Sequence, residues 1–142
     1  MQIQNILIVC MGNICRSPMA EYFLKQQFPK RHIYSAGIAA LVAQAADQKS
    51  ILAMQNFGID IQQHRARQLQ LEHLKTAELI LVMSKRQQQL LETKWPFIKG
   101  RVFRLGHWQN ANVEDPYQQD QIIFDQTCKQ IKAYLADWQE HL

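Results

Sequence analysis

Cys10 and Arg16 lie at the two ends of a short loop that also contains Gly12. The apolar run 6–9 precedes this loop, and a pattern typical of a helix start begins at Ser17. Backbone N–H groups of the loop, the positive end of that helix and the guanidinium of Arg16 would all favour a thiolate at Cys10. The same donors bind a phosphate dianion. The spacing therefore predicts a loop that activates a cysteine sulfur and holds a phosphate ester.

Chance produces this spacing only rarely. With three cysteines and seven arginines in 142 residues, the chance that any of the cysteines is followed by arginine six positions later is roughly one in seven. A requirement for Ser or Thr at the next position lowers this chance to under about one per cent. Neither Cys15 nor Cys128 meets the same test. The alternative for Cys10 is a buried cysteine at the end of a core strand, because free cysteines are among the most buried residues.

Each residue type in the loop fits this chemistry. The guanidinium of Arg16 can bind two phosphate oxygens at once, which the ammonium of lysine cannot match. Gly12 lets the backbone curl toward the phosphate. The hydroxyl of Ser17 can donate to the sulfur and ease its departure in a second step. We expect the substrate to be bound by the loop residues Met11, Gly12, Asn13, Ile14, Cys15 and Ser17.

A phosphate ester that leaves as an alkoxide or phenoxide needs a proton from a general acid. Asp115 is the best candidate, because it lies in the polar segment 106–117, where Pro116 would stiffen the chain. The same carboxylate would then deprotonate the attacking water. By spacing alone Asp115 could be a turn residue, since Asp-Pro is a common turn dipeptide, and Glu114 is a rival acid. Better structural interpretations exist for three other carboxylates, as a cap or as groups on helix surfaces: Asp47, Asp125 and Asp137.

Strands and helices alternate in the predicted secondary structure. Apolar runs predict strands at 3–9, 32–35, 79–83 and 102–105, and helical periodicity predicts helices at 18–28, 47–57, 71–75 and 84–95. A last helix follows the polar loop 106–117 and carries apolar residues from Phe124 to Leu142. This order predicts an α/β fold with three layers, in which a four-stranded parallel sheet has helices on both faces and the phosphate-binding loop follows the first strand. Ligands bind at the carboxyl ends of such strands, so the loops after strands one and four can meet.

Three helix starts carry capping residues in the sequence. Ser17 can cap the first helix with Pro18 at its first position, and Asp47 and Ser84 can cap later ones. The last helix has an apolar stripe that should face a core: Phe124, Cys128, Ile131, Leu135, Trp138 and Leu142.

Bulk composition narrows the class of protein. A length of 142 residues predicts one domain, 1–142, and 47% hydrophobic with 20% charged residues is ordinary for a globular protein. Because no apolar run approaches a membrane span and no signal-type segment opens the chain, we expect a cytoplasmic protein. Three cysteines do not form a disulfide framework, which fits a reducing compartment. A net charge of +4 does not indicate a nucleic-acid binder.

The segment 10–21 resembles the low-molecular-weight protein tyrosine phosphatases. The similarity continues in order along the chain, through 35–37, 58–60, 64–69 and 115–117. Segments 35–42 and 106–108 are most similar to the bacterial branch of this family, which is paired with the tyrosine autokinases of capsule and exopolysaccharide export.

The resemblance implies roles for individual residues. Cys10 would be the nucleophile that forms a phosphocysteine, Arg16 the phosphate clamp and Asp115 the general acid and base. Asn13 would hold the loop in its unusual conformation, and His64 would buttress it. We expect the activity to need no metal and no cofactor. The implied partner is a phosphotyrosyl protein, namely the cytoplasmic tail of a membrane tyrosine autokinase.

Two features of the loop and its surroundings are less specific. Cys15 occupies the place of a second loop cysteine of the family, so a reversible disulfide with Cys10 and a simple packing role are equally compatible with the sequence. Met11, Leu41 and Tyr117 would form the walls of a slot for phosphotyrosine, because the 38–45 stretch lacks the aromatic residue that mammalian members place there.

Rival functions are distinguished by particular residues. A thioredoxin-coupled arsenate reductase shares this fold and loop, but it needs further cysteines, and none occurs between Cys15 and Cys128. A phosphotyrosine-binding module without turnover has no use for the acid Asp115. A dinucleotide-binding domain would need a Gly-x-Gly-x-x-Gly pattern after the first strand, and this pattern is absent.

Overall fold

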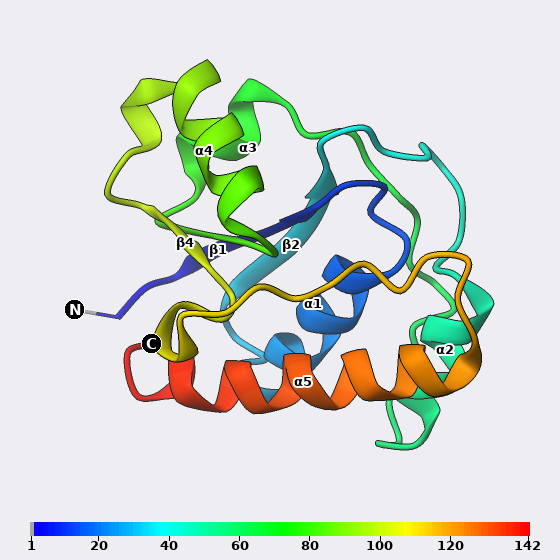
Figure 1. Ribbon diagram of the computed structural model, residues 1–142. Helices are drawn as coiled ribbons and strands as arrows, with labels where there is room; N and C mark the ends of the chain where they lie inside the picture. Colours follow the sequence, from blue (N-terminus) through cyan, green and yellow to red (C-terminus); the bar gives the residue numbers. More distant parts are fainter. Residues whose placement is uncertain (1) are drawn as a thin grey trace.

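A single parallel sheet forms the centre of the computed structural model, which describes residues 2–142 (Figure 1). Its strands are β1 (Asn5–Cys10), β2 (His32–Gly37), β3 (Leu79–Val82) and β4 (Val102–Arg104), in the order β2-β1-β3-β4. The helices are α1 (Arg16–Gln27), α2 (Gln48–Gln55), α3 (Leu71–Thr76), α4 (Lys85–Lys94) and α5 (Gln121–Gln139), with short 3₁₀ helices η1 (Pro96–Ile98) and η2 (His107–Gln109). The predicted four-stranded parallel sheet is confirmed.

Alternate residues of β1 supply the cores of the two outer layers. Ile6 and Ile8 pack in one apolar cluster with residues of α1, α2 and α5. Leu7 and Val9 point to the other face, where a second cluster includes Leu74 of α3 and Leu91 of α4. Figure 1 shows α1, α2 and α5 on one side of the sheet and α3 and α4 on the other. The expected three-layer arrangement with helices on both faces is therefore present.

Helix α5 closes the lower layer with a buried stripe. Five of the six predicted core positions are buried: Phe124, Cys128, Ile131, Leu135 and Trp138. The sixth, Leu142, lies beyond the end of α5 and is only partly buried against the same core. The indole N–H of Trp138 donates to the carbonyl oxygen of Leu105 at 2.9 Å, which ties α5 to the segment after β4. Neither α5 nor any other helix within residues 2–142 is long and apolar enough to cross a membrane.

Two of the three predicted helix caps are confirmed. Asp47 accepts a hydrogen bond from the backbone of Lys49 at the start of α2, and Ser84 caps α4 in the same way. The prediction for Ser17 is wrong: α1 begins at Arg16, its N-cap residue is Cys15, and no side chain caps it. The hydroxyl of Ser17 is instead hydrogen-bonded to side chains of the preceding loop, and this tertiary contact outweighs the local capping preference.

The carboxyl ends of the strands meet at one edge of the sheet. Cys10 pairs with Gly37, and Val82 pairs with both Val9 and Arg104. Beyond β4, the backbone N–H of Val113 donates to the carbonyl oxygen of Met83 at 2.8 Å. The segment after β4 is thus fastened beside the end of β3, and residues about a hundred positions apart come together at this edge, as expected.

Gly106, where that segment begins, has no room for a side chain. A Cβ atom there would lie 2.3 Å from the carbonyl oxygen of Ala111, so Gly106→Ala forces the backbone to shift. We expect this variant to lower the free energy of unfolding by about 3 kcal/mol, at the upper end for overpacking, measured by urea denaturation.

Gly58→Ala is the matched control. A Cβ atom at Gly58 meets nothing within 4 Å, so only its positive φ of 71° opposes the change, at a cost of about 1 kcal/mol. Equal losses in the two variants would contradict the steric explanation.

Candidate active site

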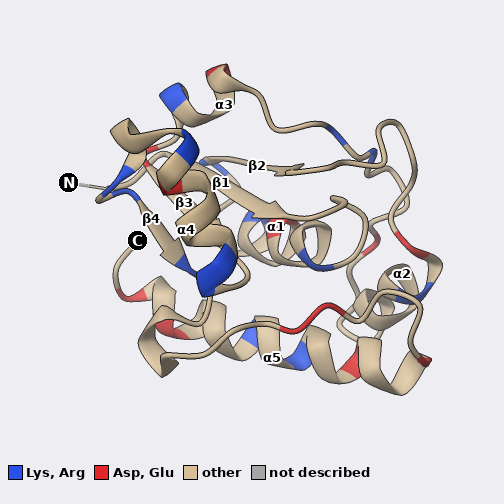
Figure 2. Ribbon diagram, turned by 45° about the horizontal axis from the view of Figure 1, so that its top comes forward, with Lys and Arg blue, Asp and Glu red and all other residues tan. Residues whose placement is uncertain are grey.

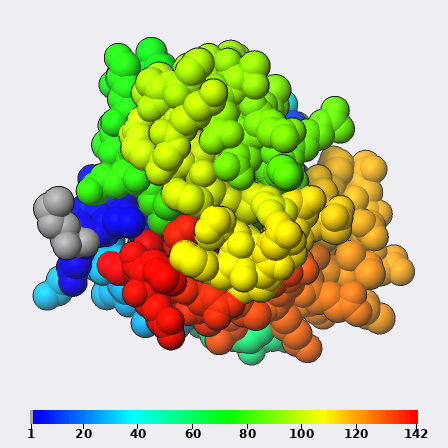
Figure 3. Space-filling model, turned by 60° about the vertical axis from the view of Figure 1, so that its left-hand side comes forward, coloured from blue at the N-terminus to red at the C-terminus, as the bar shows by residue number. Residues whose placement is uncertain are grey.

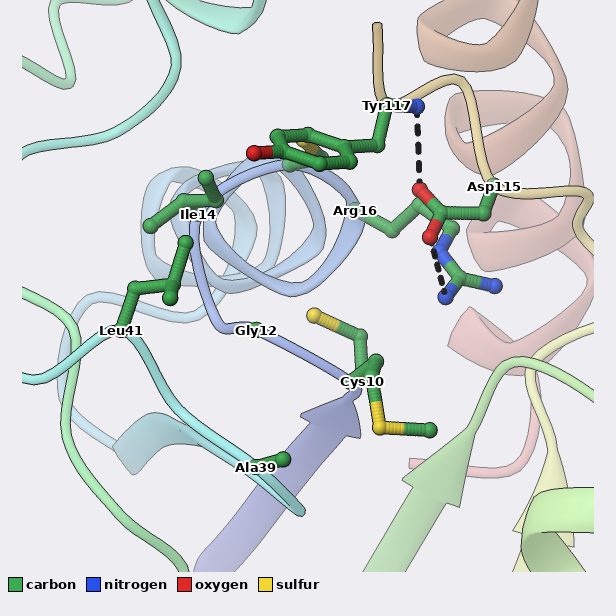
Figure 4. A pocket seen from close by; sticks show the side chains of 10 residues that line it. Cys10, Gly12, Ile14, Arg16, Ala39, Leu41, Asp115 and Tyr117 are labelled. Atoms are coloured by element: carbon green, nitrogen blue, oxygen red, sulfur yellow. Dashed lines mark hydrogen bonds and ion pairs between the residues drawn. The ribbon is translucent and has the colours of Figure 1, made fainter.

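A cavity of about 210 Å³ opens at the carboxyl edge of the sheet (Figure 4). Nine of the residues predicted from the sequence line it: Cys10, Met11, Gly12, Ile14, Cys15, Arg16, Leu41, Asp115 and Tyr117. Ala39 also lines it and was not predicted. The side chains of Asn13, Ser17 and His64 are buried and do not line the cavity. The predicted residues therefore divide into a lining group and a group that supports the loop.

Asn13 is the loop residue with the unusual backbone conformation. Its φ is 60°, in the left-handed region that asparagine tolerates better than most residues. Its side-chain amide donates to Ser17 Oγ at 2.8 Å and to Ser35 Oγ at 2.9 Å, while its side-chain oxygen accepts from the backbone of Arg67 at 2.9 Å. The unusual φ is thus not at Gly12, where a Cβ atom would make only ordinary contacts.

The hydroxyl of Ser17 lies 2.8 Å from the sulfur of Cys10. A hydroxyl has one proton, and because Asn13 already donates to this oxygen, the proton of Ser17 can point at the sulfur. Ser35 accepts from Asn13 and donates onward to the buried carboxylate of Glu21 at 2.5 Å. The hydrogen bonds fix the orientation of Asn13 and leave Ser17 as a donor to Cys10.

Arg16 is buried, and its guanidinium is held from one side. One terminal nitrogen, Nη1, donates to the carbonyl oxygen of Val113 at 2.8 Å, and the other, Nη2, lies 3.6 Å from a carboxylate oxygen of Asp115. The third nitrogen, Nε, is buried and has no hydrogen-bond partner among the described residues. Nε and Nη2 form a fork on the side away from Val113, the geometry that binds two oxygens of a phosphate.

Asp115 lies across the cavity from the loop on an anchored segment. Its side chain is 45% exposed, and its second oxygen accepts from the backbone N–H of Tyr117 at 3.1 Å. Figure 4 shows this carboxylate between Tyr117 and the guanidinium of Arg16, facing the side of the cavity where Cys10 lies. The rival acid, Glu114, does not line this cavity. The arrangement joins a sulfur, an anion-binding guanidinium and a partly exposed carboxylate.

The family model described as "Low molecular weight phosphotyrosine protein phosphatase" matches residues 5–142. The chain belongs to this family. It is therefore a protein-tyrosine-phosphatase, and the predicted resemblance is confirmed.

Relatives and solved structures match the phosphatase over nearly its whole length. It is 55% identical over 142 residues to the low molecular weight protein-tyrosine-phosphatase Ptp of Acinetobacter johnsonii, with all of both chains covered. The crystal structure of the Erwinia amylovora tyrosine phosphatase AmsI is 34% identical with a TM-score of 0.94 and covers 99% of this chain and 94% of its own. Wzb of Vibrio vulnificus in complex with benzylphosphonate is 32% identical with a TM-score of 0.95, covering 99% and 100%.

In this phosphatase a second segment brings Leu41 to the cavity. Backbone N–H groups at 38, 39 and 41 donate to the carbonyl oxygens of residues 10, 11 and 12, at 2.9–3.0 Å, so the segment continues alongside the end of β1. The side chain of Gln68 fastens it by accepting from Ala40 N at 2.9 Å and donating to the carbonyl oxygen of Ile38 at 2.8 Å. Leu41 and Tyr117 then lie on the outer part of the same cavity (Figure 4).

Cys15 is a buried free thiol beside a carboxylate. Its sulfur lies 3.9 Å from Asp47 Oδ2, and burial, followed by the charge of Asp47, raises the pKa of the Cys15 thiol well above its usual range. The thiol form is therefore strongly favoured, and Cys15 is a poor attacking group in this conformation.

His64 supports the loop from behind. Its Nε2 lies 2.7 Å from the carbonyl oxygen of Asn13, and since a carbonyl can only accept, Nε2 carries the proton. Burial lowers the pKa of His64, an effect that the hydrogen bond to Asn13 partly opposes. The side chain is thus neutral near pH 7 and donates one hydrogen bond to the loop.

Sequence reasoning did not identify several residues that hold the site together. Ser35 and Glu21 complete the hydrogen bonds behind Asn13, Gln68 fastens the Leu41 segment, and Val113 accepts from Arg16. Ser35, Glu21 and Gln68 lie in segments that carry the family resemblance, which was the one available signal. Val113 acts through its backbone, so its residue type carried none. Within residues 2–142, no three His, Cys, Asp or Glu side chains come together as a metal site requires.

The lowered pKa of His64 predicts a stability loss in acid. Unfolding restores the ordinary pKa near 6.5, so the unfolded chain binds more protons as the pH falls below that value, and the contribution of His64 is lost on further acidification through its folded pKa. The slope from one such group is at most about 1.4 kcal/mol per pH unit. We expect His64→Gln, whose amide can still donate to Asn13, to remove this part of the slope.

Urea denaturation of both proteins between pH 8 and pH 5 measures the effect. The difference at pH 8 reports only the altered hydrogen bond and packing, so it serves as the internal control. Parallel stability curves for wild type and variant over the whole range would refute a neutral His64 in the folded protein.

Proposed function

We propose that Cys10 is the nucleophile of this phosphatase, Arg16 its phosphate clamp and Asp115 its general acid and base. The observation that carries this proposal is the single cavity that Cys10, Arg16 and Asp115 line together. The loop backbone around Gly12 and Ile14 supplies further donors for the phosphate oxygens. Asn13 and His64 hold the loop from behind.

In the first step the thiolate of Cys10 attacks phosphorus, a sulfur–phosphorus bond forms and the bond from phosphorus to the phenolic oxygen breaks. Asp115 in its protonated form gives its proton to that oxygen, so a neutral tyrosine leaves. The Nε and Nη2 groups of Arg16 bind two equatorial oxygens of the transferring phosphoryl group and stabilise its charge.

In the second step the carboxylate of Asp115 removes a proton from water as the water attacks phosphorus. The sulfur–phosphorus bond breaks, phosphate leaves and the thiolate returns. The hydroxyl of Ser17, 2.8 Å from the sulfur, donates to the departing thiolate and lowers the cost of its charge. No metal or cofactor takes part in either step of this proposal.

The walls of the cavity favour an aromatic phosphate. Met11, Leu41 and Tyr117 enclose it above the phosphate loop, which gives a ring apolar surface on several sides. The matched Wzb of Vibrio vulnificus was solved with benzylphosphonate, in which a methylene group joins a phenyl ring to a phosphonate. We infer that this chain binds the ring of phosphotyrosine in the same relation to its loop.

The physiological substrate that we propose is a tyrosine autokinase of capsule or exopolysaccharide export. The relatives named Wzb and AmsI are phosphatases of the capsule and exopolysaccharide type, which supports this choice. The phosphorylated tail of such a membrane kinase extends into the cytoplasm, where we propose that the phosphatase acts.

The rival functions lack support from the site. An arsenate reductase needs a relay cysteine, but Cys128 is fully buried against Met54, and burial raises the pKa of its thiol to about 12. A phosphotyrosine-binding module would bind the same ligand, and turnover distinguishes the two.

Replacing the sulfur is the first test. We expect Cys10→Ser to abolish hydrolysis of an aryl phosphate and of a phosphotyrosyl peptide, because the hydroxyl is a far weaker nucleophile, while binding of the peptide persists. Stopped assays for phosphate and calorimetric titration measure the two properties. Substantial turnover in Cys10→Ser would refute the phosphocysteine mechanism.

Replacing the acid is the second test. We expect Asp115→Asn to lower kcat by about 10²–10⁴ for esters with poor leaving groups and by less for good ones, because only the poor leaving group needs the proton. Glu114→Gln is the matched control, since its side chain lies outside the cavity. A series of aryl phosphates of graded leaving-group acidity separates the two variants. If Asp115→Asn stayed active and Glu114→Gln lost activity, Glu114 would be the general acid instead of Asp115.

A further inference from the structure

A groove of about 680 Å³ leads away from the catalytic cavity toward helix α4. Met11, Arg16 and Asp115 line both the cavity and the groove. Its other lining residues come from the first two to three turns of α4 and from the segment after β4: Ser84, Arg86, Gln87, Gln89, Leu90, Thr93, Asn112, Val113 and Glu114. Figure 3 shows these two elements as neighbours on one face of the molecule, with α4 in yellow-green and the segment after β4 in yellow to orange.

The walls of this groove are fixed by hydrogen bonds. The side-chain oxygen of Asn112 accepts from the backbone of Lys85 at 3.1 Å and from Arg104 at 2.9 Å, which joins the segment after β4 to the start of α4. The side chain of Gln87 is buried and accepts from the backbone of Met83 at 2.9 Å. A ligand in the groove therefore meets preformed walls and does not have to order them.

Arg86 is a charged residue of the groove whose side chain has no interaction partner within the described fold. Its side chain is exposed and forms no ion pair or hydrogen bond with any other part of the described chain 2–142. It also lies in the first turn of α4, where a positive charge opposes the helix dipole, so it does not stabilise the helix. One turn further along, the side chain of Leu90 is 48% exposed and adds apolar surface to the same wall.

The opposite wall carries the opposite charge. Glu114 is exposed on the segment after β4 and, like Arg86, forms no ion pair among residues 2–142. Figure 2 shows basic positions on α4 and an acidic stretch in the loop that runs above α5. The groove is thus polarised: an acidic side chain is attracted to the α4 wall and repelled by the wall at Glu114.

We propose that this groove binds the polypeptide segment next to the phosphotyrosine of the substrate, and that Arg86 selects substrates with Asp or Glu in that segment. The inference rests on the proposed function, since the phosphate loop must hold the phosphotyrosine. A chain leaving the cavity past Met11 and Asp115 enters the groove directly, because these residues belong to both. An apolar neighbour packs on Leu90, and a carboxylate pairs with the free guanidinium of Arg86.

Matched phosphotyrosyl peptides test this selection. One peptide has neutral residues on both sides of the phosphotyrosine; others carry Asp or Lys on the amino-terminal or the carboxyl-terminal side. The measured quantity is the ratio of kcat/KM for an acidic peptide to that for the neutral peptide. For wild type we expect a ratio of about two to five at low salt on one of the two sides, as for an exposed ion pair, and a smaller ratio at high salt.

Charge-reversal variants show which wall of the groove causes the preference for acidic peptides. Arg86→Glu should favour the Lys peptide over the Asp peptide, and its new carboxylate suits the first turn of a helix, so the fold should be retained. Glu114→Lys should raise the wild-type preference. Lys129→Glu, on the exposed surface of α5 and outside both cavities, changes the net charge by the same amount as Arg86→Glu and should keep the wild-type ratio.

The outcomes separate this inference from the proposed function. Peptide hydrolysis with equal ratios in wild type and Arg86→Glu overturns the role of Arg86, and an equal shift in Lys129→Glu reduces it to net charge. Absence of hydrolysis for every substrate overturns the proposed function instead. In that case the ratio of peptide affinities in the Cys10→Ser background, which needs no turnover, decides whether the groove discriminates charge.

Discussion

The buried amide of Asn13 is the interaction on which the site depends. Its two donors and its acceptor are used by Ser17, Ser35 and the backbone of Arg67, while its own carbonyl oxygen accepts from His64. These contacts keep the residue in the left-handed region, which an unsupported non-glycine residue would seldom occupy. They also decide which way the proton of Ser17 points, and so whether the sulfur of Cys10 has a donor. The side chain of Asn13 therefore sets both the backbone conformation of the loop and the hydrogen bond that reaches the Cys10 sulfur.

A second contact joins the two halves of the site. The guanidinium of Arg16 donates to the carbonyl oxygen of Val113, whose N–H is bound in turn to the end of β3. Asp115 follows two residues later, so its position relative to the loop 10–17 is fixed by the same side chain that we propose as the phosphate clamp. Arg16 therefore has a structural role that does not depend on a bound substrate.

Local sequence signals were sufficient for much of the fold. Alternating apolar runs and helical periodicity predicted the parallel sheet, and the caps Asp47 and Ser84 were identified because their partners lie two or three residues away. Ser17 was misassigned for the opposite reason. Its hydroxyl looks like a cap within its own segment, but its partners lie in the folded loop, where a sulfur and an amide compete for it.

The candidate site shows the same division. Cys10, Arg16 and Asp115 were found because their residue types and spacing imply chemistry. Gln68 and Val113 were not, because they act on distant backbone and their residue types imply no chemistry. The groove beside α4 was not predicted either. In the sequence Arg86 is indistinguishable from a solvent-exposed charge, and only the fold shows that it lies next to the candidate active-site cavity.

The sharing of three residues between the cavity and the groove has an evolutionary consequence. Met11, Arg16 and Asp115 line the cavity of the proposed reaction, whereas the residues of α4 line only the groove. Exposed positions on α4 can therefore drift without loss of the chemistry. Under the proposed role of the groove, a lineage exchanges one protein substrate for another by changing the surface of a single helix, while the loop 10–17 stays the same.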